Sequence, residues 1–130
     1  MSSPAEPDKL FEITILRHGE SIGNFENRLQ GQMDYPLTEL GIRQAEALAN
    51  RWISSGICFD HIISSPLSRA YQTATIIAEK LNINQIETDP LWMERDMGVF
   101  SGQTFFFSMK LTIFLRTLSF YRYYILGVYH

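Results

Sequence analysis

Residues 61–75 read HIISSPLSRAYQTAT, and this stretch predicts how the fold is built. Ile62 and Ile63 lie in a short β-branched run that is typical of a buried strand. Ser65 and Pro66 follow it directly, as a capping hydroxyl and a proline suited to the first position of a helix. Apolar residues then recur at helical spacing, at Ala70, Ala74, Ile77 and Leu81. The stretch predicts a strand followed by a helix that begins at Ser65–Pro66.

The alternation of strand and helix extends to both sides of this stretch. Residues 11–16 (FEITIL) are predicted to form another buried strand, and residues 86–88 (IET) a third. Between them, Thr38 is a predicted N-cap for a helix over residues 39–54, whose apolar residues recur every three or four positions. Strands that alternate with helices favour an α/β fold with a mainly parallel sheet.

The composition limits the classes of function. A chain of 130 residues with 45% hydrophobic residues is the size of one globular domain. Its net charge of −3 argues against nucleic-acid binding, which requires a basic excess. The single cysteine, Cys58, rules out an internal disulfide and is expected to be a small buried side chain. The polar segment 1–10 has no apolar run of the kind found in signal peptides, so a cytoplasmic protein is expected.

The composition changes sharply towards the C-terminus. All 14 acidic residues lie at or before Asp96, whereas residues 105–130 are rich in Phe and Tyr. Arg116 and Arg122 interrupt every apolar window in this tail, which disfavours a membrane span. We therefore expect a tail foreign to the preceding domain, from a frameshift, a retained intron or a deletion.

Three polar clusters follow predicted strands. They are Arg17-His18-Gly19-Glu20, the segment around Arg69, and Glu94-Arg95-Asp96. Ligands of open α/β sheets bind beyond the carboxyl ends of the strands, so the three clusters predict one site. Gly19–Gly23 also fits the G-x-S-x-G pattern of esterases. That interpretation is rejected because only about twenty residues precede Ser21, too few for the strands and oxyanion loop that such a site needs.

The motifs LRHGES, QGQMDYPLTELGIRQA, SSPLSRAYQTA and MERDMGVFSG together resemble the histidine phosphatase (phosphoglycerate mutase-like) superfamily. The resemblance runs from about Ile13 to about Thr104 and defines a partial domain over 11–104. It implies a three-layer α/β/α sandwich with a mainly parallel sheet and an enzyme that needs no metal or cofactor. The residues implied as catalytic or substrate-binding are His18 as nucleophile, Glu94 as proton donor, Arg17 and Arg69 as phosphate ligands, and Asn24, Gln30 and Gly31 in the pocket.

The resemblance leaves the reaction open among three alternatives. Mutases of the superfamily typically carry tryptophan where this chain has Gln32, and tyrosine where it has Met97. Both departures favour a phosphatase that acts on a phosphorylated small molecule through phosphohistidine. A mutase-like enzyme and a truncated remnant that only binds phosphate are the alternatives.

Members of the superfamily are typically longer, and their second half supplies another strand and a second histidine. Nothing in residues 105–130 matches that half, and the last residue, His130, is not expected to be the second histidine. The sequence therefore predicts a sheet that lacks a central strand.

Overall fold

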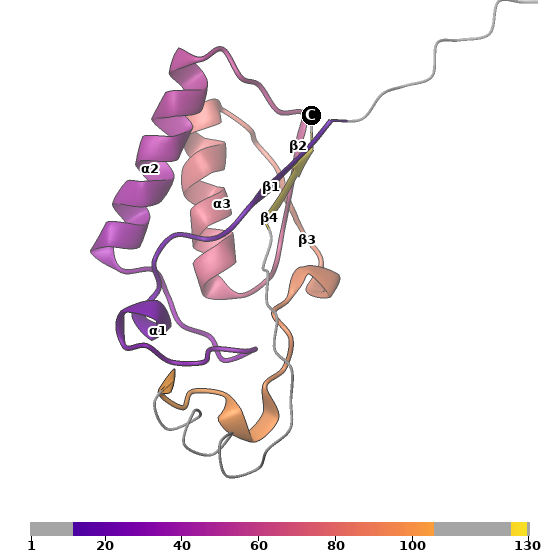
Figure 1. Ribbon diagram of the computed structural model, residues 1–130. Coiled ribbons are helices and arrows are strands. Elements are labelled where there is room, and N and C mark those ends of the chain that lie inside the picture. Colours follow the sequence, from indigo (N-terminus) through magenta and orange to yellow (C-terminus); the bar gives the residue numbers. More distant parts are fainter. Residues whose placement is uncertain (1–11, 106–125, 130) are drawn as a thin grey trace, which may run out of the picture.

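The structure is a computed structural model that describes residues 12–105 and the backbone of 126–129 (Figure 1). Four strands form one sheet in the order β1-β4-β2-β3: β1 (Ile13–Leu16), β4 (Leu126–Tyr129), β2 (His61–Ser64) and β3 (Ile86–Thr88). β2 and β3 pair in parallel, and β4 is antiparallel to both of its neighbours. It follows that β1, β2 and β3 all run in one direction, as the sequence predicted, and their carboxyl ends lie at the same edge.

The centre of the sheet is occupied by β4, so the prediction of a missing central strand is wrong. Gly127 is opposite Ile15 of β1 and Ile63 of β2 in the two registers. Without β4, the facing edges of β1 and β2 would present unpaired backbone N–H and C=O groups. The rest of the predicted tail lies outside the described residues, as does His130.

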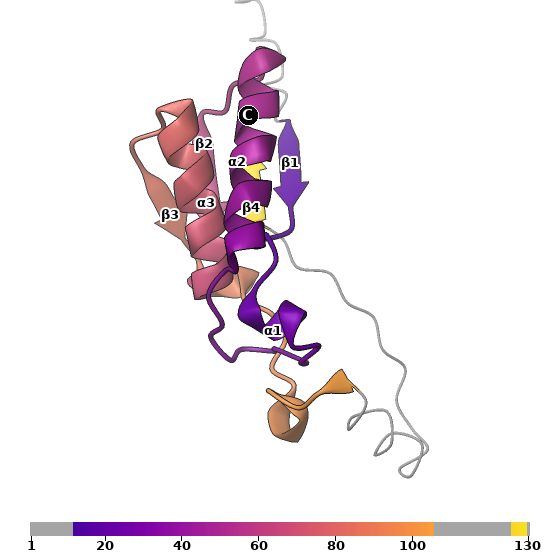
Figure 2. The same cartoon turned by 90° about the vertical axis from the view of Figure 1, so that its left-hand side faces the viewer.

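Two long helices cover one face of this sheet (Figures 1 and 2). Helix α2 (Glu39–Ser54) has the predicted bounds, and the Thr38 hydroxyl accepts a hydrogen bond from the Gly41 amide as its N-cap. Helix α3 (Ser68–Leu81) packs beside α2 over a core of small side chains and Ile62 and Ile77. Trp52 meets Phe59 edge to face at the end of this core, with ring centroids 4.7 Å apart.

The other face of β1 is exposed, which corrects the expectation of a buried strand. Ile13 and Ile15 retain 52% and 54% of their accessible surface. The reason is that both long helices lie on the opposite face (Figure 2). Cys58, expected to be buried, is also exposed.

The start of α3 is the second correction. The helix begins at Ser68, not at Ser65–Pro66, and Leu67 occupies the N-cap without a side-chain hydrogen bond. Residues 65–67 make the turn from strand to helix, and the Ser65 hydroxyl accepts the Leu67 amide there at 3.3 Å. The prediction failed because Asp34, from a distant loop, accepts the Ser68 amide and hydroxyl, so the helix begins at Ser68 without a local cap.

The remaining elements are short and lie at the carboxyl edge of the sheet. They are α1 (Ile22–Phe25) and the 3₁₀ turns η1 (Pro90–Trp92) and η2 (Gly98–Phe100). Among the described residues, no helix combines the length and apolar character needed to cross a membrane.

Candidate active site

The three polar clusters converge at the carboxyl edge of the sheet. Arg17 and His18 follow β1, and Arg69 lies in the first turn of α3 just beyond β2. The chain leaving β3 is tied to the same edge, because the Asp89 amide donates to the Ser64 carbonyl at 3.0 Å. Glu94 follows within five residues. The structure thus places all three clusters at one edge of the sheet, where ligands of open α/β sheets bind.

His18 is held as a neutral imidazole with a defined tautomer. Its Nδ1–H donates to the Gly19 carbonyl at 2.6 Å, so Nε2 keeps its lone pair. Burial lowers the pKa of His18 to about 4, and the charges of Arg69 and Arg17 act in the same direction, against the opposing effect of the Gly19 hydrogen bond. At neutral pH the side chain is a free nucleophile or base.

Glu94 is the opposite case, a carboxyl group that titrates near neutral pH instead of well below it. Burial raises its pKa to about 7, although the cations Arg69 and Arg17 oppose the shift. The side chain is 7% exposed, and its Oε1 atom has no hydrogen-bond partner among the described residues. A buried oxygen without a hydrogen-bond partner lowers the stability of the folded protein, and it marks a position where a ligand atom can bind.

Arg69 is the buried cation of the site. It is 2% exposed, and it donates from Nη1 to the Met33 carbonyl at 2.9 Å and from Nη2 to the Gly31 carbonyl at 2.8 Å. Burial lowers the pKa of Arg69, while the nearby carboxyl groups of Glu94 and Asp34 raise it. A guanidinium has five N–H groups, so three remain for a ligand after these two bonds.

Arg17 supplies the second positive charge. Its side chain is exposed and makes no hydrogen bond or ion pair within the described part of the chain. Its charge nevertheless acts on His18, Arg69 and Glu94. Two guanidinium groups beside a neutral imidazole suit a phosphate dianion, which guanidinium groups bind through paired N–H donors.

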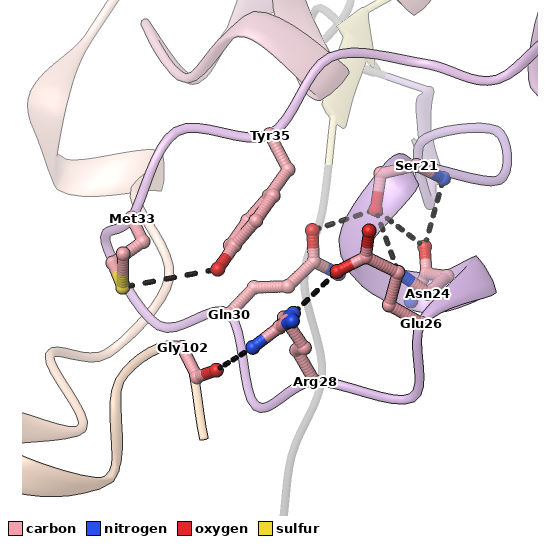
Figure 3. Close-up of polar contacts among 8 residues, drawn as sticks. All are labelled: Ser21, Asn24, Glu26, Arg28, Gln30, Met33, Tyr35 and Gly102. Atoms are coloured by element: carbon pink, nitrogen blue, oxygen red, sulfur yellow. Dashed lines mark hydrogen bonds and ion pairs between the residues drawn. The ribbon is translucent and has the colours of Figure 1, made fainter. Parts of the chain in front are cut away.

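Asn24 and Gln30 are organised by Ser21 (Figure 3). The Ser21 hydroxyl lies 2.6 Å from Gln30 Oε1 and 2.9 Å from Asn24 Oδ1, and its single proton serves one of them at a time. Asn24 Oδ1 also accepts the Ser21 amide at 3.1 Å, which completes a capping box for α1. The side-chain oxygens of Asn24 and Gln30 are thereby engaged in hydrogen bonds, whereas their NH₂ groups are available to donate hydrogen bonds to a ligand. Ser21 itself is fully buried, which agrees with rejecting it as an esterase nucleophile.

Gly31 lies where a side chain would be crowded and its backbone strained. Its φ is +52°, and an added Cβ would be 3.0 Å from the Ser101 hydroxyl and 3.1 Å from Met97. The loop around it is joined to residues 102–105, as Arg28 donates from Nη1 to the Gly102 carbonyl at 2.8 Å (Figure 3). The backbone of Leu29 exchanges hydrogen bonds with Gly102 and Gln103. These contacts fix the carbonyl groups that hold Arg69.

Two residues that support the site were not expected from the sequence. Asp34 accepts hydrogen bonds from the Ser68 amide at 2.7 Å and from the Ser68 hydroxyl at 2.6 Å, so it caps α3 from a distant loop. Thr73 is 1% exposed and bonds to both Gly19 and Arg69. The spacing of four between Arg69 and Thr73 was the available signal for the second residue, since it places both on one helix face.

No group of three or more His, Cys, Asp or Glu side chains within the described residues is placed to hold a metal ion.

Comparison with known proteins finds relatives in both sequence and structure. A family model described as "Histidine phosphatase superfamily (branch 1)" matches residues 13–111. Among curated proteins, "Probable phosphoglycerate mutase GpmB" of Yersinia pestis (strain Pestoides F) is 46% identical over 94 residues. That alignment covers 72% of this chain and 42% of the relative.

Solved structures of the same group superimpose on the described fold. Phosphoserine phosphatase from Entamoeba histolytica, in complex with 3-phosphoglyceric acid, is 35% identical with a TM-score of 0.64 over 77% of this chain and 47% of that one. Mycobacterial glucosyl-3-phosphoglycerate phosphatase is 30% identical with a TM-score of 0.66 over 82% and 52%. YhfR of Bacillus stearothermophilus is 33% identical with a TM-score of 0.68 over 75% and 47%.

These neighbours confirm the predicted α/β sandwich of the histidine phosphatases, to which the described residues contribute the sheet and one helical layer. The chain spans about two fifths of the length of the curated relatives it matches.

Proposed function

The chain belongs to the histidine phosphatase superfamily, and from that premise we propose that it carries the phosphoryl-accepting site of a phosphomonoester phosphatase. The observation that supports this most directly is the pairing of a neutral His18 with a Glu94 that titrates near neutrality. A nucleophile without a proton and an acid with one are what the first step of the reaction needs. The substrate class is a phosphorylated small molecule, as for the phosphoserine phosphatase and the glucosyl-3-phosphoglycerate phosphatase among the structural neighbours.

In the proposed first step, His18 Nε2 attacks phosphorus and the bond from phosphorus to the ester oxygen breaks. Glu94 gives its proton to the departing alkoxide, which would otherwise be a poor leaving group. Arg17 and Arg69 balance the charge on the phosphoryl oxygens without a metal ion or cofactor. Asn24 and Gln30 offer their NH₂ groups, and the close approach of the backbone at Gly31 completes the pocket.

In the second step, water attacks the phosphohistidine and the bond from phosphorus to nitrogen breaks. The Glu94 carboxylate takes a proton from that water, which restores its acid form. Inorganic phosphate leaves, and His18 returns to the tautomer fixed by the Gly19 carbonyl. One group serves as acid and then as base, and a pKa near 7 suits both roles.

One alternative has specific support. The similarity to proteins described as probable phosphoglycerate mutases favours a mutase, which would return the phosphoryl group to a phosphoglycerate instead of water. The other alternative is a protein that binds phosphate without turnover. Gln32 and Met97 stand where mutases of the superfamily typically carry tryptophan and tyrosine, and this favours the phosphatase.

Transfer of radioactive phosphate from p-nitrophenyl phosphate to the 130-residue chain, quenched in base, tests the proposal. Phosphohistidine survives base, so the wild-type chain should carry label and His18→Asn should carry none. His61→Asn is the matched control, because His61 is exposed at the start of β2, and it should label as the wild type does.

The fate of the label separates the alternatives. Loss to water supports the phosphatase, and transfer to added 3-phosphoglycerate supports the mutase. A folded wild-type chain that takes no label but binds inorganic phosphate would establish binding without turnover and refute both enzymes.

A further inference from the structure

Thr73 connects two parts of the site that come from different elements. Its hydroxyl accepts a hydrogen bond from the Gly19 amide at 3.1 Å and donates one to the Arg69 carbonyl at 2.7 Å. The side chain is 1% exposed, so water does not compete for either bond. A hydroxyl has one proton to donate and lone pairs to accept, and Thr73 uses both capacities here.

The hydrogen bond from Thr73 to the Arg69 carbonyl would not by itself indicate a role in the site. Threonine in a helix commonly donates to the carbonyl four residues earlier, and Thr75 does the same to Tyr71 at 2.9 Å. The bond from Gly19 is different in kind, because Gly19 and Thr73 are 54 residues apart in the sequence. It joins the loop that follows β1 to the helix that follows β2.

Gly19 sets the state of the nucleophile. Its amide is held by Thr73, and its carbonyl accepts the Nδ1 proton of His18. On the side of α2 there is no spare room, since a Cβ on Gly19 would be 2.4 Å from the Gly41 carbonyl oxygen. Gly19 is thus held between α2 and α3, and Thr73 supplies the hydrogen bond on the α3 side.

Arg69 lies at the other end of the same connection. Its backbone carbonyl receives the Thr73 proton, and its guanidinium holds the carbonyl groups of Gly31 and Met33. From these contacts we propose that Thr73 is a positioning residue, whose hydroxyl fixes the His18 loop relative to Arg69 so that the imidazole faces a bound phosphoryl group in the reactive geometry. The inference rests on the proposed function of His18 as nucleophile.

Thr73→Val tests the inference, because valine keeps the shape and removes the hydroxyl. We expect the rate of His18 labelling to fall by about tenfold to a hundredfold, which is the size of loss that a displacement of about 1 Å causes at a reacting centre. Thr73→Ser should restore the rate to within about threefold of the wild type, since it returns the hydroxyl. Thr75→Val is the matched control on the same helix and should label at the wild-type rate.

A second readout does not depend on turnover. Nitrogen NMR of the imidazole reports the tautomer and titration of His18, and in the wild-type chain it should show a proton on Nδ1. In Thr73→Val the Gly19 amide loses its acceptor and the Gly19 carbonyl is no longer held against Nδ1, so we expect a mixture of tautomers. Because the Gly19 hydrogen bond raises the pKa of His18, its loss should move the His18 titration further below pH 6.5. A packing defect that only exposed the ring would move the titration the other way, towards pH 6.5, because burial is the main cause of the lowered pKa.

The outcomes separate the two proposals. Wild-type labelling and a wild-type imidazole spectrum in a folded Thr73→Val chain would overturn the inference. A wild-type chain without label refutes the proposed nucleophile, yet the spectrum still decides whether Thr73 controls His18. If Thr73→Val does not fold, Thr73→Cys takes its place, because sulfur is a weak acceptor, and the inference fails if its spectrum and labelling match those of Thr75→Cys.

Discussion

Replacing Glu94 by glutamine should change how the free energy of unfolding depends on pH, and this tests the electrostatics of the site without any substrate. The pKa of Glu94 is raised from 4.5 to about 7 in the folded chain, mainly by burial. Between these values the folded state keeps a proton that the unfolded state has lost. The free energy of unfolding therefore falls as the pH rises through this range and levels off above pH 7.

His18 has the opposite effect. Its pKa is lowered from 6.5 to about 4, again mainly by burial, so between these values the unfolded state binds the extra proton. The His18 contribution to the free energy of unfolding rises as the pH increases from about 4 to 6.5. Each shift corresponds to about 3 kcal/mol at 1.36 kcal/mol per pH unit.

The contributions of Glu94 and His18 to the free energy of unfolding change in opposite directions between about pH 4.5 and 6.5. They therefore largely cancel in the wild-type chain. Glu94→Gln removes one of them, so its free energy of unfolding should rise by about 3 kcal/mol across this range and stay high at pH 8. In His18→Asn only the Glu94 contribution remains, so the free energy of unfolding should fall by a similar amount between about pH 4.5 and 7.

Urea unfolding, followed by tryptophan fluorescence at half-unit steps from pH 4 to 8, measures these profiles, since Trp52 packs against the core. A Glu94→Gln profile that runs parallel to the wild type at every pH would refute the argument. It would mean that Glu94 titrates normally and is not the acid of the site.

Three further predictions concern the acid, the cap and the glycine contact. Glu94→Gln should slow hydrolysis of alkyl phosphates by about a hundredfold or more and of aryl phosphates much less, because aryl oxides leave without a proton; equal losses in kcat would contradict this. Asp34→Ala should lower the free energy of unfolding by about 1 kcal/mol through the lost cap of α3, and Asp34→Asn by less because it keeps an acceptor; equal shifts in urea midpoint for the two would argue against capping. Gly41→Ala places a Cβ 2.1 Å from the Glu20 carbonyl oxygen and should cost about 1–3 kcal/mol, whereas Arg43→Ala on the exposed side of α2 should be nearly neutral in the same urea titration.

The sequence predicted those elements whose signals lie within a few residues of each other. The helix over 39–54 was correct at both ends, because Thr38 caps it locally and its apolar residues repeat at helical spacing. The strand at 86–88 was also correct. The gathering of His18, Arg69 and Glu94 followed from strand direction, since parallel strands end at one edge.

The errors occurred where distant segments decide the outcome. Helix α3 starts at Ser68 because Asp34, 34 residues away, supplies the acceptors that a local cap would have provided. The exposure of Ile15 depends on which face the helices cover, and an apolar strand looks the same in sequence whether one face is covered or both.

The same distinction between local and long-range causes applies to the chemistry of the site. The sequence by itself determined which groups are present, the imidazole of His18, the carboxyl of Glu94 and the two guanidinium groups, together with the local elements that carry them. Only the tertiary structure decided their protonation, because the pKa values of His18 and Glu94 are set by burial and by Arg69 and Arg17. It also placed β4 between β1 and β2. Caps and periodicity act between near neighbours in the chain, whereas burial and the fields of other charges exist only once distant segments have packed together.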